Sequence, residues 1–196
     1  MKNYYIKKYK KIKMIKEINR NLLITFIYPG CEIYIKSFID SLNIQKDKNF
    51  KVIFFCDEIK IKKNIFRKLN ISSVFYQLKG SISNIRQKAL RKILEIKPKK
   101  ICFADVDDIM ADNRTKVVFK LLDKNNIVFN DLDLCFKNKK IKNYLSKYFK
   151  NHQKLNYLDI LDSNCIGFSN SAINFNLLSK NRKNIFTSKK IIVYDW

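Results

Sequence analysis

Short apolar runs alternate with amphipathic stretches over the first 130 residues, and this alternation limits the fold more than any other feature of the sequence. A short apolar run between turn signals is typical of a buried strand, whereas apolar residues three and four apart are typical of a helix. The runs that indicate strands are residues 22–27, 50–56, 74–76, 101–104 and 127–129. The helical spacings between them are Ile35, Phe38, Ile39 and Leu42; Ile61, Ile65, Phe66 and Leu69; Ile85, Ala89, Ile93 and Ile96; and Val117, Val118, Leu121 and Leu122. This order predicts the α/β class, with a mostly parallel central sheet, right-handed crossovers and helices on both faces.

The second half of the chain follows this pattern less clearly. Residues 138–154 are polar and lysine-rich, which favours a surface helix. Residues 165–168 favour a strand, and Ile173, Leu177 and Leu178 indicate a helix behind it. Residues 191–194 indicate a last strand, after which the sequence stops at Asp195 and Trp196. Because no helix remains to cover that strand, a chain truncated at its C-terminus is our expectation.

The formal net charge of +24 on 196 residues requires an explanation. With 46% hydrophobic residues the chain is globular, and its length suits one domain with a sizeable core. Three explanations stay open: a nucleic-acid site, attraction to anionic lipid or nucleotide phosphates, and a codon bias toward Lys, Ile and Asn. Lysines are spread over the whole length. Codon bias with a generally basic surface is therefore the preferred explanation, and nucleic acid is not the expected partner.

A basic N-terminal arm, residues 1–20, precedes the first strand. Tyr5, Tyr9, Ile12 and Ile15 fall at helical spacing among lysines. The arm is thus either a peripheral contact with the inner face of the plasma membrane or a solvated extension. The sequence has no secretory signal and no run long enough to span a bilayer. Five scattered cysteines without a C-x-x-C pair indicate a reducing compartment, so we expect a cytoplasmic protein.

Three carboxylates end the fourth predicted strand. Asp105, Asp107 and Asp108 directly follow the apolar run 101–104. In an open α/β sheet, ligands bind beyond the carboxyl ends of the strands, and adjacent acids repel one another unless a cation offsets their charge. Aspartate is a hard oxygen ligand that suits Mg²⁺ or Mn²⁺. The cluster therefore predicts a divalent-metal site shared with a phosphate-bearing ligand, with a solvated acidic turn as the alternative.

Several common uses of such a sheet do not fit the sequence. The turn after the first strand reads Tyr28-Pro29-Gly30-Cys31, not G-x-G-x-x-G, and no P-loop motif occurs. A phosphatase with an aspartate nucleophile would carry its D-x-D after the first strand. A nucleotide-sugar transferase does fit, because a carboxylate-held metal can neutralise a nucleoside diphosphate leaving group. One general base then activates the acceptor hydroxyl.

Four places between residues 21 and 130 carry a family resemblance. They are the strand and turn from Ile24 to Pro29, Asp57 at the end of the second strand, the segment from Ser83 to Leu90, and the D-x-D-D from Asp105 to Asp108. In these places the chain resembles glycosyltransferases of the GT-A fold, in particular the inverting family 2. It departs from that family at Tyr28-Pro29-Gly30, after Glu58, where Gly-Ser is missing, and at Gln87, where Asn is usual.

The resemblance implies roles for the first strand and the acidic cluster. Asp107 would ligate Mn²⁺ or Mg²⁺, and Asp105 and Asp108 would complete or assist the metal site. Asp105 would also contact the ribose or a metal-bound water. Thr25 and Tyr28 would belong to the strand and turn that contact the nucleotide.

The resemblance also implies roles elsewhere in the chain. Asp57 would read the nucleobase, and Arg86 would pair with a phosphate or with the acidic cluster. Asp195 would be the catalytic general base, since Tyr194-Asp195-Trp196 resembles the family's late motif. Asp131 and Asp133 either line the sugar or acceptor pocket or belong to a solvated loop.

The sequence thus predicts the basic arm at 1–20 and a single GT-A, Rossmann-like domain at 21–196. Residues 21–130 would bind the nucleotide sugar and residues 131–196 the acceptor. The implied function is metal-dependent, inverting transfer of a sugar from a nucleotide-sugar donor to a cell-surface glycan or a lipid-linked saccharide. A catalytically inactive transferase-like binding domain is the alternative, and a nucleic-acid-binding α/β domain is the third hypothesis.

Overall fold

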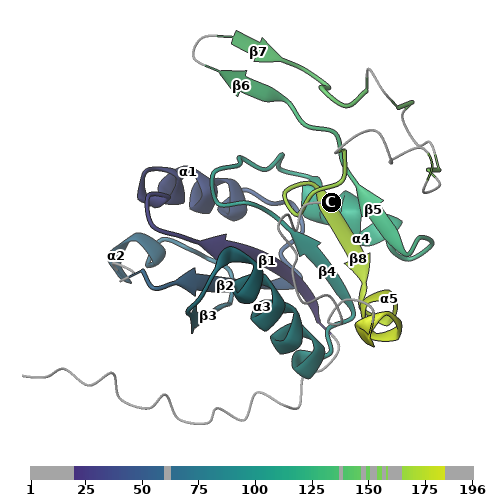
Figure 1. The fold of residues 1–196 in the computed structure, drawn as a ribbon. Helices are drawn as coiled ribbons and strands as arrows, with labels where there is room; N and C mark the ends of the chain where they lie inside the picture. Colours follow the sequence, from purple (N-terminus) through teal and green to yellow (C-terminus); the bar gives the residue numbers. More distant parts are fainter. Residues whose placement is uncertain are drawn as a thin grey trace, which may run out of the picture.

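A computed structural model describes residues 20–59, 63–136, 139–146, 149–150, 154–155, 158 and 165–183 (Figure 1). The N-terminal arm up to residue 19, the predicted last strand and Asp195 lie outside the described residues. Within the described part, no helix is long and apolar enough to cross a membrane.

A six-stranded sheet forms the centre of the domain, in the order β3-β2-β1-β4-β8-β5. Its strands are β1 (Asn21–Ile27), β2 (Phe50–Asp57), β3 (Ser73–Leu78), β4 (Lys100–Phe103), β5 (Ile127–Phe129) and β8 (Ser171–Asn174). β1 pairs in parallel with β2 and β4, and β2 with β3. β8 runs antiparallel to both of its neighbours, β4 and β5. The predicted α/β class with a mostly parallel central sheet is confirmed.

Helices cover both faces of this sheet (Figure 1). They are α1 (Glu32–Asn43), α2 (Lys63–Phe66), α3 (Ile82–Ile96), α4 (Arg114–Leu121) and α5 (Phe175–Lys180). One core packs α1 and α4 on the sheet through Phe38, Leu42 and Phe119. The other packs α3 and α5 through Ile93 and Leu178. The alternation of period-2 and period-3.6 segments therefore produces the layered arrangement that the sequence predicts.

Helix α3 begins and ends where its sequence directs. The Ser81 hydroxyl accepts a hydrogen bond from the Asn84 backbone N–H, which satisfies one of the free donors of the first turn. Lys97 ends the helix in a left-handed conformation (φ 53°) and Pro98 follows. In α4, by contrast, Val117 and Leu121 are exposed, at 44% and 37%, so of the four apolar residues whose spacing predicts an inward face, only Val118 and Leu122 are buried.

The chain after β5 differs from the prediction. Residues 165–170 form a loop and a turn, not a strand, because the Asn170 side chain bonds to the backbone at Cys165, Gly167 and Asn130. The strand is β8, which contains Ile173, and the helix α5 begins only at Phe175. The predicted surface helix at 138–154 is wrong for its described residues 139–146: residues 139–141 form β7 (Lys139–Ile141), which pairs with β6 (Leu134–Phe136) as a hairpin, and residues 142–146 form bends and turns.

Candidate functional site

The carboxyl ends of β1, β2 and β4 lie at one edge of the sheet because the three strands are parallel. Chain order reverses between β1 and β4, since β2 and β3 extend the sheet on one side of β1 and β4 lies on the other. Crevices at such a switch point are where ligands bind in open α/β sheets. Tyr28 follows β1, Asp57 ends β2, and Asp105 follows β4. The topology thus brings Tyr28, Asp57 and Asp105 to one edge of the sheet.

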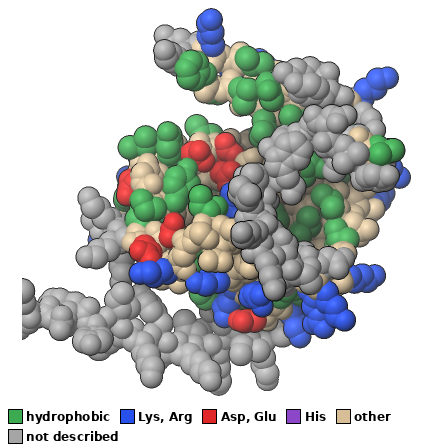
Figure 2. Space-filling view, in the orientation of Figure 1, with side chains coloured by type: hydrophobic (Ala, Val, Ile, Leu, Met, Phe, Trp, Pro, Cys, Tyr) green, Lys and Arg blue, Asp and Glu red, His purple; other side chains and the backbone are tan. Residues whose placement is uncertain are grey.

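The acidic loop after β4 is anchored by its apolar residues. Val106 and Met110 are buried at 1% and 3% exposure, whereas Asp107 is exposed and Asp105 and Asp108 are half-buried. The Asp108 backbone N–H donates to the Asp105 carbonyl, which closes a tight turn. Because Val106 and Met110 pack into the core, the loop lies against the domain and its carboxylates lie at the surface. In Figure 2 a group of acidic side chains gathers on the upper part of the domain, while lysine and arginine surround its lower end.

Tyr28 lies beside this acidic loop. Burial, the charges of Asp107 and Asp105, and a hydrogen bond to the Asp107 carboxylate together raise the pKa of its hydroxyl to about 12. The hydroxyl therefore stays protonated at neutral pH and acts as a donor to Asp107. The turn after β1 and the loop after β4, which are far apart in the sequence, form one polar surface.

Arg114, the first residue of α4, stabilises the end of β4, from which the acidic loop begins. Its guanidinium is buried and donates to the Phe103 carbonyl at 2.7 Å, the Ser169 carbonyl at 2.7 Å and the Asn130 amide oxygen at 2.9 Å. Burial raises the pKa of Asp108, the nearby Asp107 charge raises it too, and Arg114 opposes both. Arg114 thus ties the end of β4 to the turn before β8 and supplies positive charge under the cluster.

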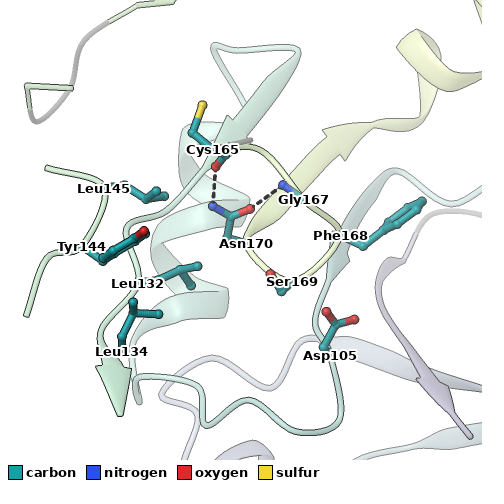
Figure 3. A pocket seen from close by; sticks show the side chains of 10 residues that line it. All are labelled: Asp105, Leu132, Leu134, Tyr144, Leu145, Cys165, Gly167, Phe168, Ser169 and Asn170. Carbon is teal, nitrogen blue, oxygen red and sulfur yellow. Dashed lines mark hydrogen bonds between the residues drawn. The ribbon is translucent and has the colours of Figure 1, made fainter. Parts of the chain in front are cut away.

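A cavity of about 200 Å³ opens beside Asp105 (Figure 3). Its walls come from the acidic loop, the segment after β5 and the turn before β8. Figure 3 shows Asp105 and Phe168 on one side, Leu132, Leu134, Tyr144 and Leu145 on the other, and Ser169 and Asn170 between them. Cys165 and Gly167 complete the lining. The walls are polar and apolar in about equal measure, so the cavity offers both packing surface and hydrogen-bonding groups, among them the Asp105 carboxylate.

Arg86 on α3 reaches the wall of this cavity. Its guanidinium lies over the ring of Phe168, 5.2 Å from the ring centre, and Phe168 packs edge-on against Phe103 at 4.7 Å. Stacking of this kind holds a guanidinium in place without neutralising its charge. The predicted anion-binding residue is therefore held at the same side of the site as Asp105.

Comparisons with known proteins give structural neighbours and no sequence match. No protein-family model matches the sequence, and no curated protein matches it. The solved structures that match include the first 349 residues of S. aureus TarS, with a TM-score of 0.68 at 16% identity over 90% of this chain and 52% of that one. The 4-diphosphocytidyl-2C-methyl-D-erythritol synthase of Anaerococcus prevotii matches with a TM-score of 0.58 at 13% identity, over 93% and 81%. Both are GT-A structures.

The chain has the GT-A fold. The expectation drawn from the D-x-D-D and its neighbours is confirmed at the level of fold. The chain spans about half the length of the TarS structure. The same region of S. aureus TarS has been solved in complex with UDP and matches this chain with a TM-score of 0.59 at 18% identity, over 83% of this chain and 49% of that one.

Within this GT-A domain, Thr25 lies in β1, the strand that the resemblance assigns to the nucleotide. Its side chain is fully buried, and its hydroxyl has no hydrogen-bond partner within the described structure. Strand residues alternate between the two faces, and Thr25 points into the same layer as Leu23 and Ile27. Its side chain therefore belongs to the core, and its role toward a nucleotide stays a prediction.

Asp131 and Asp133 do not face the cavity. The Asp131 carboxylate accepts hydrogen bonds from the backbone N–H groups of Leu132 and Leu145, both at 2.7 Å, and from Ser146. Asp133 accepts from the Asn143 backbone and pairs with Lys140 at 3.0 Å. These bonds lower the pKa of both carboxyls against their burial. Both residues order the hairpin segment.

Sequence reasoning missed three residues of the site, Arg114, Phe168 and Asn170. Two of them left a signal in the sequence. Arginine is rare in this lysine-rich chain. An arginine can therefore indicate a position where the planar guanidinium, with its several hydrogen-bond donors, is needed. Asn170 sits in the run Ser169-Asn170-Ser171, which is typical of a hydrogen-bonded turn. Phe168 looked like the end of a strand and left no signal of its own.

Proposed function

We propose that this chain transfers a sugar from a nucleotide-sugar donor to a glycan or lipid-linked saccharide acceptor. The observation that carries the proposal is the position of Asp105, Asp107 and Asp108 at the switch point of a GT-A sheet, beside a cavity of about 200 Å³. The donor diphosphate would lie over the acidic loop and its sugar would enter the cavity. A TarS structure that matches this chain was solved in complex with UDP, which supports a nucleotide as a ligand of this chain.

A divalent cation, Mn²⁺ or Mg²⁺, fits the donor set of the acidic loop. No three His, Cys, Asp or Glu side chains converge into a complete metal cage among the described residues. The proposed cation would be held by one or two carboxylates and completed by substrate phosphates, as Mg²⁺ commonly is. Asp107 would hold it with Asp105, and Asp108, whose carboxyl has a pKa raised by burial, would assist. Such a cation would neutralise charge on the leaving diphosphate.

The remaining residues would bind and orient the two substrates. Asp57 would accept hydrogen bonds from the nucleobase at the end of β2, and Arg86 would bind a phosphate. Tyr28 would orient the Asp107 carboxylate through its hydroxyl. Asp195 would be the general base, taking the proton of the acceptor hydroxyl as that oxygen attacks the anomeric carbon and the diphosphate leaves from the opposite face. One such displacement inverts the configuration at that carbon.

The test is nucleotide binding by Asp107→Asn. We expect wild-type protein to bind UDP, GDP, CDP or dTDP more tightly with Mn²⁺ than without, and the variant to lose about tenfold or more of that metal-dependent affinity. Isothermal titration with each nucleotide measures it. Asp40→Asn is the matched control, because Asp40 is an exposed carboxylate on α1 that pairs only with Lys36 within the described structure. Equal Mn²⁺-dependent binding by Asp107→Asn and wild type would refute the proposal.

A nucleotidyltransferase is the second candidate function. It is favoured by the match to 81% of the length of the Anaerococcus prevotii synthase, a larger share than for TarS. Such an enzyme takes a nucleoside triphosphate and releases pyrophosphate, whereas a sugar transferase releases a nucleoside diphosphate. The same titrations extended to nucleoside triphosphates separate the two, and nucleotide binding without turnover of either kind favours the inactive binding domain.

A further inference from the structure

The β6–β7 hairpin carries an apolar face. Its register pairs Leu134 with Ile141 and Phe136 with Lys139. Side chains two residues apart in a strand share a face, so all four lie on the same side of the hairpin, which we term the ribbon face. Phe136 is 69% exposed, Ile141 56% and Leu134 38%. Exposed apolar side chains gathered on one face mark an interaction site more often than single ones do.

Lysines accompany this apolar face. Lys139, Lys140 and Lys142 are all exposed, and one described acid, Asp133, pairs with Lys140 at 3.0 Å. The hairpin is therefore net positive. It stands away from the body of the domain at the top of Figure 1, and Figure 2 shows hydrophobic and lysine side chains together there.

Two physical arguments decide what covers the ribbon face. A two-stranded hairpin gains little stability alone, so a surface that covers its apolar side would stabilise it. A second copy of this chain would bring two lysine-rich hairpins together on molecules of charge +24, and like charges oppose that contact. An anionic bilayer satisfies both arguments. Its interfacial region accepts apolar side chains, and its phosphates attract lysines instead of repelling them.

We propose that the ribbon face docks on an anionic phospholipid bilayer. Phe136, Ile141 and Leu134 enter the headgroup–acyl boundary, and Lys139 and Lys142 lie at the level of the phosphates. Leu134 also lines the cavity that Asp105 borders. Docking therefore holds the mouth of that cavity close to the membrane, where an acceptor that stays in the bilayer can reach it. The docking itself does not depend on the proposed function.

The test is co-sedimentation of the full chain with vesicles. We expect binding to vesicles of phosphatidylcholine mixed with phosphatidylglycerol and little binding to phosphatidylcholine alone. The double variant Phe136→Ser/Ile141→Ser should bind the anionic vesicles about tenfold or more weakly, since two large apolar side chains no longer enter the interface. Ile44→Ser, at an apolar residue 61% exposed at the end of α1, is the matched control and should bind like wild type. The N-terminal arm is present in every protein compared, so its contribution cancels.

A second measurement uses a fluorophore on the ribbon face. Cys135 is exposed but lies on the opposite face of the hairpin, whereas Lys139 lies on the ribbon face, and the other four cysteines are buried. An environment-sensitive fluorophore attached at position 139 of Cys135→Ser/Lys139→Cys should brighten and shift to the blue on anionic vesicles. Unchanged emission, or vesicle binding by the double variant equal to wild type, overturns the proposal. So does a wild-type dimer that ignores vesicles and becomes a monomer in the double variant, because the ribbon face is then an interface between copies.

Discussion

At the scale of single residues, Arg114 controls the shape of the site without lying on its surface. Its guanidinium bonds to Phe103 two residues before Asp105, to Ser169 in the cavity wall, and to Asn130 after β5. A planar fork can reach three acceptors at once, and a lysine ammonium cannot match that geometry. The acidic loop and the cavity wall are therefore set by one buried side chain.

Replacing Arg114 should weaken both fold and site. Arg114→Met leaves the Phe103 and Ser169 carbonyls without their donor, and we expect the free energy of unfolding to fall by about 2–4 kcal/mol. Arg114→Lys, which keeps the charge, should lose less. Urea unfolding followed by circular dichroism measures the difference. Met and Lys variants as stable as wild type would show that these bonds contribute little.

The sequence predicted the acidic residues and missed what holds them. A D-x-D-D after an apolar run places carboxylates at a strand end by chain geometry alone, so Asp105 and Asp107 could be found. Whether a strand residue such as Thr25 reaches a ligand depends on which face of the sheet it takes and how deep the strand lies. Arg114 bonds to residues 11 and 55 positions away, and such long-range contacts are not present in any local pattern.

At the scale of elements, Lys100 joins strand β4 to the end of helix α4. Its side chain is buried, and its ammonium donates to the Phe119 carbonyl near the end of α4 and to the Asp123 carboxylate at 2.6 Å. A cation at a helix C-terminus also interacts favourably with the helix dipole. The hydrogen bond from Lys100 lowers the pKa of Asp123.

The lowered pKa of Asp123 makes this link depend on pH. A carboxyl whose pKa is depressed by folding stabilises the protein above its unfolded pKa and loses that effect as pH falls through the folded value. Asp123→Asn should therefore unfold at a lower temperature than wild type from neutrality down to about pH 4, the ordinary range of an aspartate pKa. Below that pH the two melting temperatures should converge. A melting difference that is the same at every pH would mean that Asp123 acts through something other than its charge.

Helices and strands were predictable where a segment was long enough to show its apolar pattern. The prediction was wrong for most of the short segments. The runs before residue 130 gave every strand of the parallel part and its covering helices, because buried strands and amphipathic helices have distinct apolar spacings. β6, β7 and β8 are only three or four residues long. Segments this short display no period, and the equally short β5 was predictable only because its apolar run stands between turn signals. β8 gains its place from pairing with β4 and β5 and from the Asn170 turn before it.

At the scale of the whole molecule, the strand order determines where the site can be. Because β4 lies beside β1, chain order reverses between these two strands. Tyr28 follows β1 and Asp105 and Asp107 follow β4, so all three lie at this switch point. Structural neighbours at 13–18% identity share this fold. Under the proposed function, a ligand would bind at this edge, and the side chains after β5 would determine what fills the cavity beside it.

The net charge of +24 should make the stability of the whole domain depend on ionic strength. Self-repulsion destabilises a compact state, and salt screens it over a Debye length of about 10 Å at 0.1 M. The ion pairs among the described residues are mostly exposed, such as Lys36–Asp40 and Lys79–Glu58, and exposed pairs contribute little. We therefore expect potassium chloride between low and physiological concentration to raise the melting temperature by roughly a few degrees.

Scanning calorimetry over a salt series measures this effect, and sucrose at equal osmolality controls for solvent exclusion. If surface ion pairs dominated, added salt would lower the melting temperature instead, because screening weakens attraction as well as repulsion. A rise that levels off near physiological ionic strength fits lysines spread over the surface. A rise produced only by polyvalent anions such as pyrophosphate, and not by chloride, would instead indicate anion binding and not general screening.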